Sequence, residues 1–335
     1  MRARTAVMAA TAAVLAGGGT AYADGAPVAG VTVGGQGVSW GSLRYVALPA
    51  AGGTAVAQID DSSGTVDGFV SLRGSWGIPQ VAFDGTTAGI STGGQMLVLG
   101  RNSTSFSAHR TRFALVNPVK MRLQRIVTLH GAFFFDAISP DGGTMYLIQL
   151  TSPRNFLRYA VRAYDLGRDR LVPGAVVDKA EPDERMAGMP MARAASGDGV
   201  WAYTLYSKPT GRLFIHALNT QAGVARCIDL PPITFASQAR LAVDGGRLDV
   251  VMEGQVLAAV DRTTLAVTRS PAPVAKRSPA PGKPHARRSA DGARVWLAVP
   301  AGLSLAGLAL VAFRRRRPAR DGRSGGAAAG APSGP

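Results

Sequence analysis

The most informative pattern in the chain is a polar turn between two apolar runs, and residues 137–149, AISPDGGTMYLIQ, show it most clearly. Pro140 presets φ, Asp141 and Gly142 accept turn geometry, and the residues from Thr144 onward favour an extended backbone. From Asp84 through Asp141 and Asp198 to Asp244, the spacings between repeats of this frame are 57, 57 and 46 residues. The pattern predicts a repeated β-hairpin.

A repeat of this length, with no helical periodicity between the hairpins, is typical of the four-stranded blade of a β-propeller. Residues 24–270 divide into the four marked units and one N-terminal unit of similar length. The sequence therefore predicts an all-β fold, a β-propeller of about five four-stranded blades. A β-sandwich and a six-bladed propeller are the alternatives.

The third unit also resembles a known family. Ser139-Pro140-Asp141-Gly142, followed by an aromatic strand and then by VRAYDL at residues 161–166, is similar to a blade of the TolB-like and YVTN-type bacterial propellers. The other units are similar only loosely. These families share a fold and little chemistry, so the resemblance implies binding surfaces and assigns no catalytic residue.

Individual strands follow from the hydrophobic pattern within each unit. The third unit spans residues 133–177, and its opening Phe133-Phe134-Phe135 is interpreted as an innermost strand buried on both faces. The strands predicted in the other units are 43–48, 55–59, 66–72, 81–83, 88–90, 96–99, 113–116, 122–129, 200–205, 213–218, 225–230, 241–243, 248–252, 256–260 and 265–268.

The net charge of +16 does not indicate a nucleic-acid partner, because most of it lies outside the predicted propeller. Residues 24–270 carry 23 basic against 19 acidic residues, whereas 271–294 and 314–335 each carry 6 against 1. Only five of the 37 basic residues are Lys, which together with the abundant Ala and Gly indicates a GC-rich, actinobacterial source.

Residues 1–23 are predicted to be a secretory signal peptide. Arg2 and Arg4 precede an apolar run, and the small residues Ala21-Tyr22-Ala23 fit a cleavage site after Ala23. A buried N-terminal helix is the alternative. The signal peptide places the residues that follow outside the cytoplasm.

Residues 295–313 are nineteen uncharged residues followed by four consecutive Arg, the pattern of a transmembrane helix with a stop-transfer cluster. The predicted topology is a single-pass membrane protein with its ectodomain outside and a short disordered cytoplasmic tail, residues 314–335. Ala298, Gly302 and Ala306 lie four apart, so we expect weak self-association along this seam. A sortase signal is the alternative, but its Leu-Pro-x-Thr-Gly motif is absent upstream.

Between the predicted propeller and helix, residues 271–294 are rich in Pro, Ala and cations and predict an extended stalk. Its charge suits contact with anionic headgroups or phosphate-rich wall polymers. The alternative is a solvated spacer whose charges keep it extended.

Candidate catalytic residues are few. The predicted ectodomain has three His and three Glu, and no HExxH, Gly-x-Ser-x-Gly or phosphate-loop motif. The repeated Asp residues tempt one toward a metal-binding ring, but Asp before Gly at a turn usually bonds its own backbone. Cys227, the single cysteine, lies in a predicted strand and is interpreted as a buried, inert thiol. No catalytic residue and no cofactor is assigned.

Met186, Met189 and Met191 form M-x-x-M-x-M, and thioethers select Cu(I). Met is equally a filler of core gaps, which is the preferred interpretation. Trp40 and Trp76 each lie in Ser-Trp-Gly, where a propeller aromatic either stacks on a ligand or packs in the core.

Three functions fit these observations. The leading hypothesis is a membrane-tethered, extracytoplasmic propeller that acts as a binding or scaffolding module for an envelope protein or polymer. The second is a hydrolase or lyase with its site at the central channel. The third is copper handling through the Met cluster.

Overall fold

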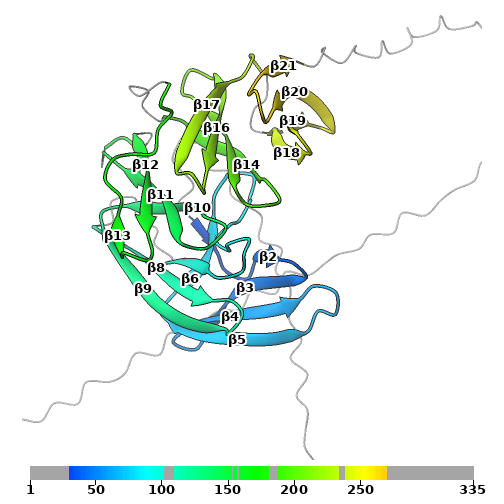
Figure 1. Cartoon of the computed structure of the whole chain (residues 1–335). Coiled ribbons are helices and arrows are strands. Elements are labelled where there is room, and N and C mark those ends of the chain that lie inside the picture. Colours follow the sequence, from blue (N-terminus) through cyan, green and yellow to red (C-terminus); the bar gives the residue numbers. More distant parts are fainter. Residues whose placement is uncertain are drawn as a thin grey trace, which may run out of the picture. The chain divides into compact units, whose positions relative to one another are not determined.

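A computed structural model describes residues 30–101, 109–152, 154–156, 158–180, 187–233 and 238–269, and the regular elements named in these ranges are β-strands. They form antiparallel sheets that follow the order of the sequence (Figure 1). Each sheet is a four-stranded meander, which is the blade of a β-propeller. The all-β prediction and the number of five blades are confirmed.

The strands of the first two sheets run from the centre outward. The first sheet is β2 (Val38–Trp40), β3 (Leu43–Ala50), β4 (Gly53–Asp60) and β5 (Val66–Arg73), and the second is β6 (Trp76–Gln80), β7 (Leu97–Arg101), β8 (Arg110–Asn117) and β9 (Arg122–His130). A fifth strand, β1 (Gly30–Thr32), pairs with the free edge of β6.

The other three sheets repeat the meander. They are β10 (Phe133–Ile138), β11 (Thr144–Leu150), β12 (Tyr159–Asp165) and β13 (Arg170–Leu171); β14 (Met189–Ala195), β15 (Trp201–Ser207), β16 (Leu213–Asn219) and β17 (Val224–Asp229); and β18 (Arg240–Asp244), β19 (Arg247–Met252), β20 (Gln255–Asp261) and β21 (Val267–Arg269).

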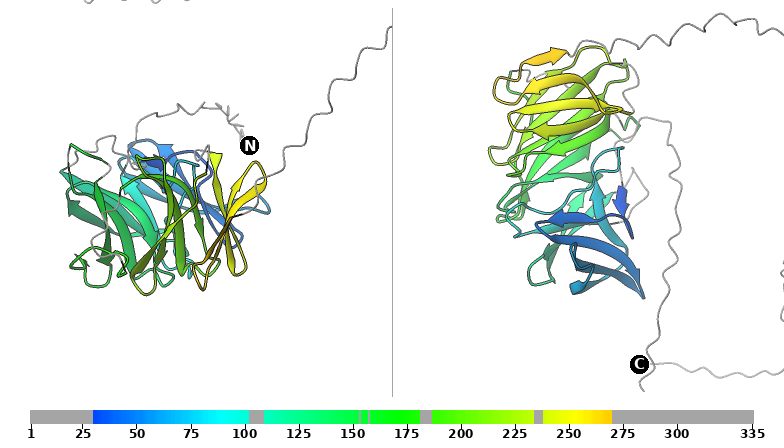
Figure 2. Two further views of the ribbon diagram at one scale, coloured as in Figure 1. Left: turned by 90° about the horizontal axis from the view of Figure 1, so that it is seen from above. Right: turned by 90° about the vertical axis from the view of Figure 1, so that its right-hand side faces the viewer.

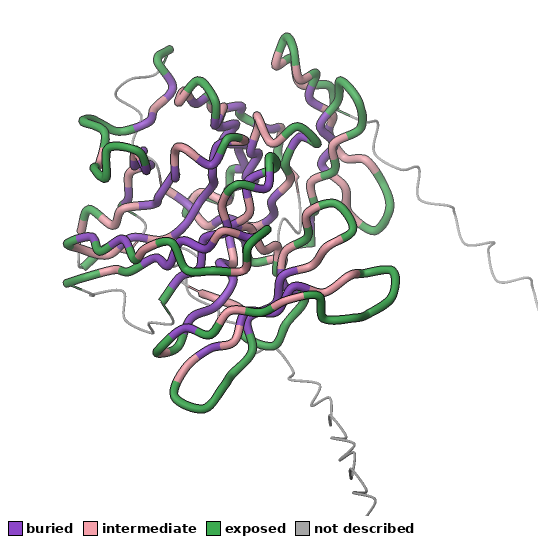
Figure 3. Tube along the Cα trace, turned by 60° about the horizontal axis from the view of Figure 1, so that its bottom comes forward, coloured by how far each residue is buried: buried purple, intermediate pink, exposed green. Residues whose placement is uncertain are grey.

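Neighbouring sheets pack face to face, and each interface has its own hydrophobic cluster (Figures 1 and 2). In the second and third sheets, for example, Phe113 and Val127 pack with Phe133, Phe135 and Leu147. Figure 3 shows the result, with buried segments along the strands and exposed segments at the turns. Because both faces of an internal sheet are covered, its strands need apolar residues at successive positions.

The prediction for Phe133-Phe134-Phe135 is confirmed. Phe133 and Phe135 belong to the cluster shared with the second sheet, and Phe134 packs against the cluster shared with the fourth sheet. This strand, β10, is the first of its sheet, so the apolar run reflects burial on both faces.

Two predicted strands are wrong. Residues 81–83 and 88–90 are not strands, because they lie in a long connection between β6 and β7 that carries only the isolated bridges Gln80↔Thr87 and Ile90↔Leu97. The first strand of the second sheet is instead Trp76–Gln80, whose Gly and Pro residues hid it.

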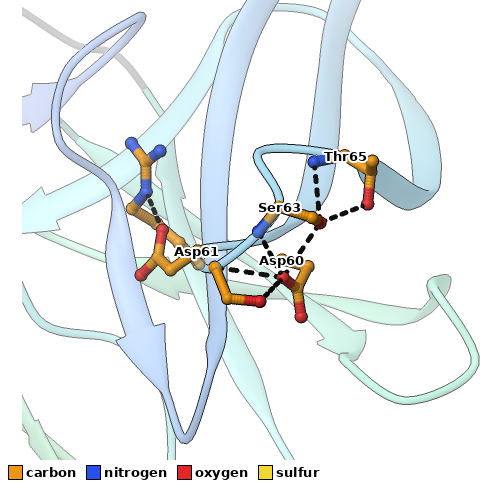
Figure 4. Close-up of polar contacts among 6 residues, drawn as sticks. Asp60, Asp61, Ser63 and Thr65 are labelled. Carbon is orange, nitrogen blue, oxygen red and sulfur yellow. Dashed lines mark hydrogen bonds and ion pairs between the residues drawn. The ribbon is translucent and has the colours of Figure 1, made fainter.

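One turn recurs in all five sheets, between the third and fourth strands. An Asp or Asn at the end of the third strand accepts backbone N–H groups two or three residues later; for Asp60 these belong to Ser62 and Ser63, at 3.0 and 2.8 Å (Figure 4). The hydroxyl of Ser62 and the other donors lower the pKa of Asp60 to about 2. The equivalent residues are Asn117, Asp165, Asn219 and Asp261.

The residue four positions after each of these side chains has a positive φ. It is glycine at Gly64 and Gly223 but Met121, Asp169 and Leu265 elsewhere, with φ between 42° and 71°. The non-glycine residues pay a steric cost there. The turn is therefore set by the Asp or Asn, and glycine only makes it easier.

The predictions for the chain termini lie outside the described residues: the signal peptide 1–23, the stalk 271–294, the transmembrane helix 295–313 and the tail 314–335. Among the residues that are described, no helix has the length and hydrophobicity to cross a membrane.

Candidate functional site

The long connection between β6 and β7, residues 81–96, is the feature that ties the sheets together, and we call it the hub segment. Its backbone reaches the first, third and fourth sheets. The indole Nε1 of Trp40 donates to the carbonyl of Thr92 at 2.8 Å. The hydroxyl of Thr92 donates to the carbonyl of Asp198 at 2.9 Å, and the amide of Gly93 donates to the carbonyl of Pro140 at 2.9 Å. One loop thus holds turns from four sheets in fixed relation.

Glycine is required at two points of this network. A Cβ on Gly94 would lie 2.2 Å from the ring of Trp40, and one on Gly199 would lie 2.5 Å from Thr92. Both glycines also have positive φ, 70° and 72°. The close approach of the Trp40 ring and of Thr92 therefore depends on missing side chains.

Asp84 anchors the hub segment to the fourth sheet. Its carboxylate accepts from the amide of Thr86 at 2.9 Å and from the amide of Arg193 at 3.3 Å. Its own amide donates to the carbonyl of Met191 at 3.0 Å, next to the bond from Phe83 to Pro190. Asp84 is therefore a structural turn residue.

Asp141 and Asp198 occupy equivalent turns in the third and fourth sheets. Each accepts from a serine hydroxyl two residues earlier, Ser139 or Ser196, and from a backbone amide two residues later. These bonds, the serine hydroxyl first, lower the pKa of both carboxyls. The turn interpretation is confirmed for both residues, which remain exposed carboxylates at neutral pH.

These turns all lie at one end of the sheets, which we call the Asp-turn face and define by Trp40, Thr92, Asp141, Asp198 and Asp244. In an antiparallel meander the connection between the first and second strands always lies at the same end. Thr92, Asp141, Asp198 and Asp244 are exposed. The face therefore presents carboxylates and hydroxyls on a rigid frame.

A second polar cluster is buried between the third and fourth sheets. Nη1 of Arg193 donates to the Asp136 carboxylate at 2.6 Å and to the hydroxyl of Thr204 at 2.7 Å, while Nη2 donates to the carbonyl of Asp136 at 2.8 Å. Asp136 and Arg193 are 3% and 8% exposed. Every partner in this ion pair is thus removed from water.

Two β-bulges accompany this pair. The register of β10 shifts between Phe135 and Ala137, so that Asp136 is the extra residue, and β14 shifts between Pro190 and Ala192. A bulge changes the direction of a side chain within a strand. The sequence alternation therefore could not place Asp136 opposite Arg193.

Tyr159 and Tyr206 lie in the same interface, with ring centroids 6.1 Å apart. Burial is the main cause that raises the pKa of both hydroxyls, well above the ordinary value for Tyr159. They stay protonated at neutral pH, which makes them hydrogen-bond donors; Tyr159 donates to the carbonyl of Gly188 at 3.2 Å.

The His and Glu residues of the sequence do not gather. His109 and His130 are exposed near the outer edge of the second sheet, His216 is buried in β16, and Glu253 lies in an exposed turn. Glu181 and Glu184 lie outside the described residues. Within the described ranges, no three His, Cys, Asp or Glu side chains are grouped so as to hold a metal ion.

Cys227 lies in β17, as predicted for a strand, and is half-buried beside the cluster of Tyr159, Tyr206 and Phe214. Its amide donates to the carboxylate of Asp178 at 2.9 Å. The residue is therefore less deeply buried than the sequence suggested.

Of the three methionines, Met189 and Met191 lie in β14 and Met186 lies outside the described residues. Met191 packs against the hydrophobic cluster between the fourth and fifth sheets. This contact is what the core-filling interpretation expects. A copper site through all three residues stays a prediction.

The two tryptophans have different environments. Trp76 is 1% exposed in the cluster between the first and second sheets, whereas Trp40 is only partly buried and belongs to the Asp-turn face. The core interpretation is confirmed for Trp76.

No protein-family model and no curated protein sequence matches the chain. Among solved structures it is similar to hydrazine synthase from Kuenenia stuttgartiensis, with 17% identity, a TM-score of 0.41, and coverage of 69% of this chain and 63% of that one. It is also similar to TolB from Acinetobacter baumannii, with 11% identity, a TM-score of 0.38 and coverage of 66% and 49%. A third is the β-propeller domain of Cps50 (Swd1) from Myceliophteria thermophila, with 13% identity, a TM-score of 0.38 and coverage of 69% and 66%.

The chain thus spans less than two thirds of the length of the first two of these structures.

Proposed function

We propose that the protein is a membrane-tethered, extracytoplasmic β-propeller of an actinobacterial cell envelope that binds an envelope protein or polymer through its Asp-turn face. The tether and the location rest on the sequence: residues 1–23 as signal peptide, and 295–313 as the membrane helix that ends in a run of Arg. The stalk, residues 271–294, holds the propeller away from the membrane.

The observation that carries the binding function is the construction of the Asp-turn face. The hub segment bonds to turns of three other sheets through Trp40, Thr92 and Gly93, so their exposed groups are held in place before any partner arrives. A preorganised face loses little conformational freedom on binding. Exposed Asp141 and Asp198 favour a partner with cationic groups.

The tether is tested by adding protease to intact protoplasts that carry the full chain with a tag after Pro335. Residues 24–270 are expected to be digested and the tag to be spared, because the propeller faces outward and the tail faces the cytoplasm. Loss of the tag, or recovery of the chain as a fully soluble secreted protein, contradicts the topology.

The binding face is tested by neutralising its two best-defined carboxylates with Asp141→Asn and Asp198→Asn together. Asn retains an oxygen that accepts the turn hydrogen bonds, so the turns persist while the charge is lost. We expect the affinity for the partner captured from native envelopes to fall by about tenfold. Binding is measured by surface plasmon resonance with the full chain in detergent.

The matched control is Asp229→Asn with Glu253→Gln, which removes two exposed charges at the opposite end of the sheets. It should leave the affinity unchanged. Equal loss from both double variants points to a general charge effect and rejects the Asp-turn face. Turnover of esters, lactones, glycosides or peptides by the chain, abolished by an acidic substitution at the centre, replaces the binding function by the enzymatic alternative.

A further inference from the structure

The first sheet has one face that packs on the second sheet and one that does not. The strand register separates them: Tyr45, Val56 and Leu72 face the cluster shared with the second sheet. Residues on the other face, which we call the outer face, are Arg44, Val46, Leu48, Ala55, Ala57, Ile59, Val66, Phe69 and Ser71.

The outer face is apolar yet open to solvent. Phe69 is 66% exposed, Val66 is 59% exposed and Leu48 is 39% exposed. An internal sheet of this protein covers such residues with its neighbour, but the first sheet ends the series, and Figure 1 shows the last sheet, β18–β21, at the other end. Contiguous exposed apolar residues of this kind mark an interaction surface.

Charges along β5 indicate what fits this surface. The strand has exposed Asp67 near its beginning, Phe69 near its middle and exposed Arg73 at its end. A two-fold axis through the middle of the strand would bring Asp67 of one copy beside Arg73 of the other, twice, and would place the two Phe69 side chains together. This is the self-complementary pattern of an isologous dimer.

We propose that two copies of the protein pair through the outer faces of their first sheets, with β5 strands crossing at the two-fold axis. The last sheet is a poorer occupant, because its uncovered face carries Arg247 and Asp249, bonded at 2.7 Å, together with Arg240. Covering those charges with apolar residues would cost desolvation. The identical outer face of a second copy offers apolar residues and opposite charges at matching positions.

Site-directed cross-linking tests the pairing. Ser71 is exposed, lies on the outer face two residues from Phe69, and Ser71→Cys adds one thiol to a chain whose own cysteine is Cys227. A bismaleimide with a spacer of roughly 10 Å, the distance between packed sheets, should link two copies of the full chain in detergent. The matched control is Thr268→Cys, which is exposed on the uncovered face of the last sheet. We expect about tenfold more dimer from Ser71→Cys than from the control or the wild type.

Charge reversal provides a second test that a purely structural role would not pass. Arg73→Glu alone and Asp67→Arg alone should each weaken dimerisation about tenfold, measured by analytical ultracentrifugation of the full chain. The double variant restores both pairs across the axis and should recover the wild-type dissociation constant. Phe69→Asp should weaken dimerisation by about a hundredfold, as for a central apolar contact.

Four outcomes overturn the proposal. The first is a full chain that stays monomeric at micromolar concentrations. The second is a link between Ser71→Cys and Thr268→Cys copies when they are mixed, which would mean that first and last sheets pair. The third is a dimer that Phe69→Asp leaves intact, which would assign association to the membrane helix. The fourth is a monomer that dimerises only when residues 271–294 are removed, which would make the stalk the occupant.

Discussion

Replacement of Arg193 by Met is expected to lower the free energy of unfolding by about 3–5 kcal/mol, because it leaves the carboxylate of Asp136 buried without its partner. Arg193 also satisfies the hydroxyl of Thr204 and the carbonyl of Asp136, so three acceptors lose a donor at once. All of them lie between the third and fourth sheets, where water does not compensate. Urea unfolding of the purified chain, followed by fluorescence, measures the change.

The control for this variant is Arg44→Met. Arg44 is bonded to Asp61 at 2.7 Å, the same chemistry as the buried pair, but both side chains are more than a third exposed. Water replaces the lost partner there, so we expect a change below about 1 kcal/mol. Equal effects from the two variants would show that burial of the Arg193 pair has no energetic role.

A double variant separates the two parts of the effect. Arg193→Met with Asp136→Leu removes both charges and should recover much of the stability lost in the single variant, since a buried ion pair is often no more stable than apolar residues of similar size. A double variant as unstable as Arg193→Met alone would mean that packing rather than the uncompensated charge causes the loss.

Trp76→Ala is expected to cost about 3–5 kcal/mol, the usual range for removal of a large buried aromatic. The indole is 1% exposed among Tyr45, Ile78 and Leu99, and its Nε1 donates to the carbonyl of Arg73 at 2.8 Å. The variant opens a cavity at the interface of the first and second sheets and leaves that carbonyl without its donor. The midpoint and slope of urea unfolding give the change in free energy.

Trp40→Ala is the matched comparison, because both tryptophans lie in Ser-Trp-Gly. Trp40 is only partly buried, so we expect a loss of about 1–2 kcal/mol, chiefly from its hydrogen bond to Thr92 and its contact with Gly94. A larger loss from Trp40→Ala than from Trp76→Ala would contradict the assignment of Trp76 to the core.

The sequence by itself determined the local structure and therefore the number of sheets. Ser139-Pro140-Asp141-Gly142 and its relatives form turns through contacts within a few residues, so the pattern is visible without knowledge of the fold. A second repeat was available in the same way: Asp60, Asn117, Asp165, Asn219 and Asp261 each cap the turn between the third and fourth strands.

Sequence reasoning failed where a strand lacks the usual composition. Trp76–Gln80 contains Gly77 and Pro79, and Met189–Ala195 contains Pro190, so neither had the pattern of a central strand. Each is the first strand of its sheet, where one edge faces the centre and needs no ladder partner, although β1 pairs with β6 there. Pro is therefore tolerated.

The candidate site was decided by tertiary structure alone. Trp40, Thr92 and Asp198 are joined by bonds that span 52 and 106 residues, and Asp136 meets Arg193 only because a bulge displaces it within β10. Local preferences specify turns because the interacting groups are a few residues apart. They cannot specify which turn lies beside which, because that depends on how whole sheets pack around the hub segment.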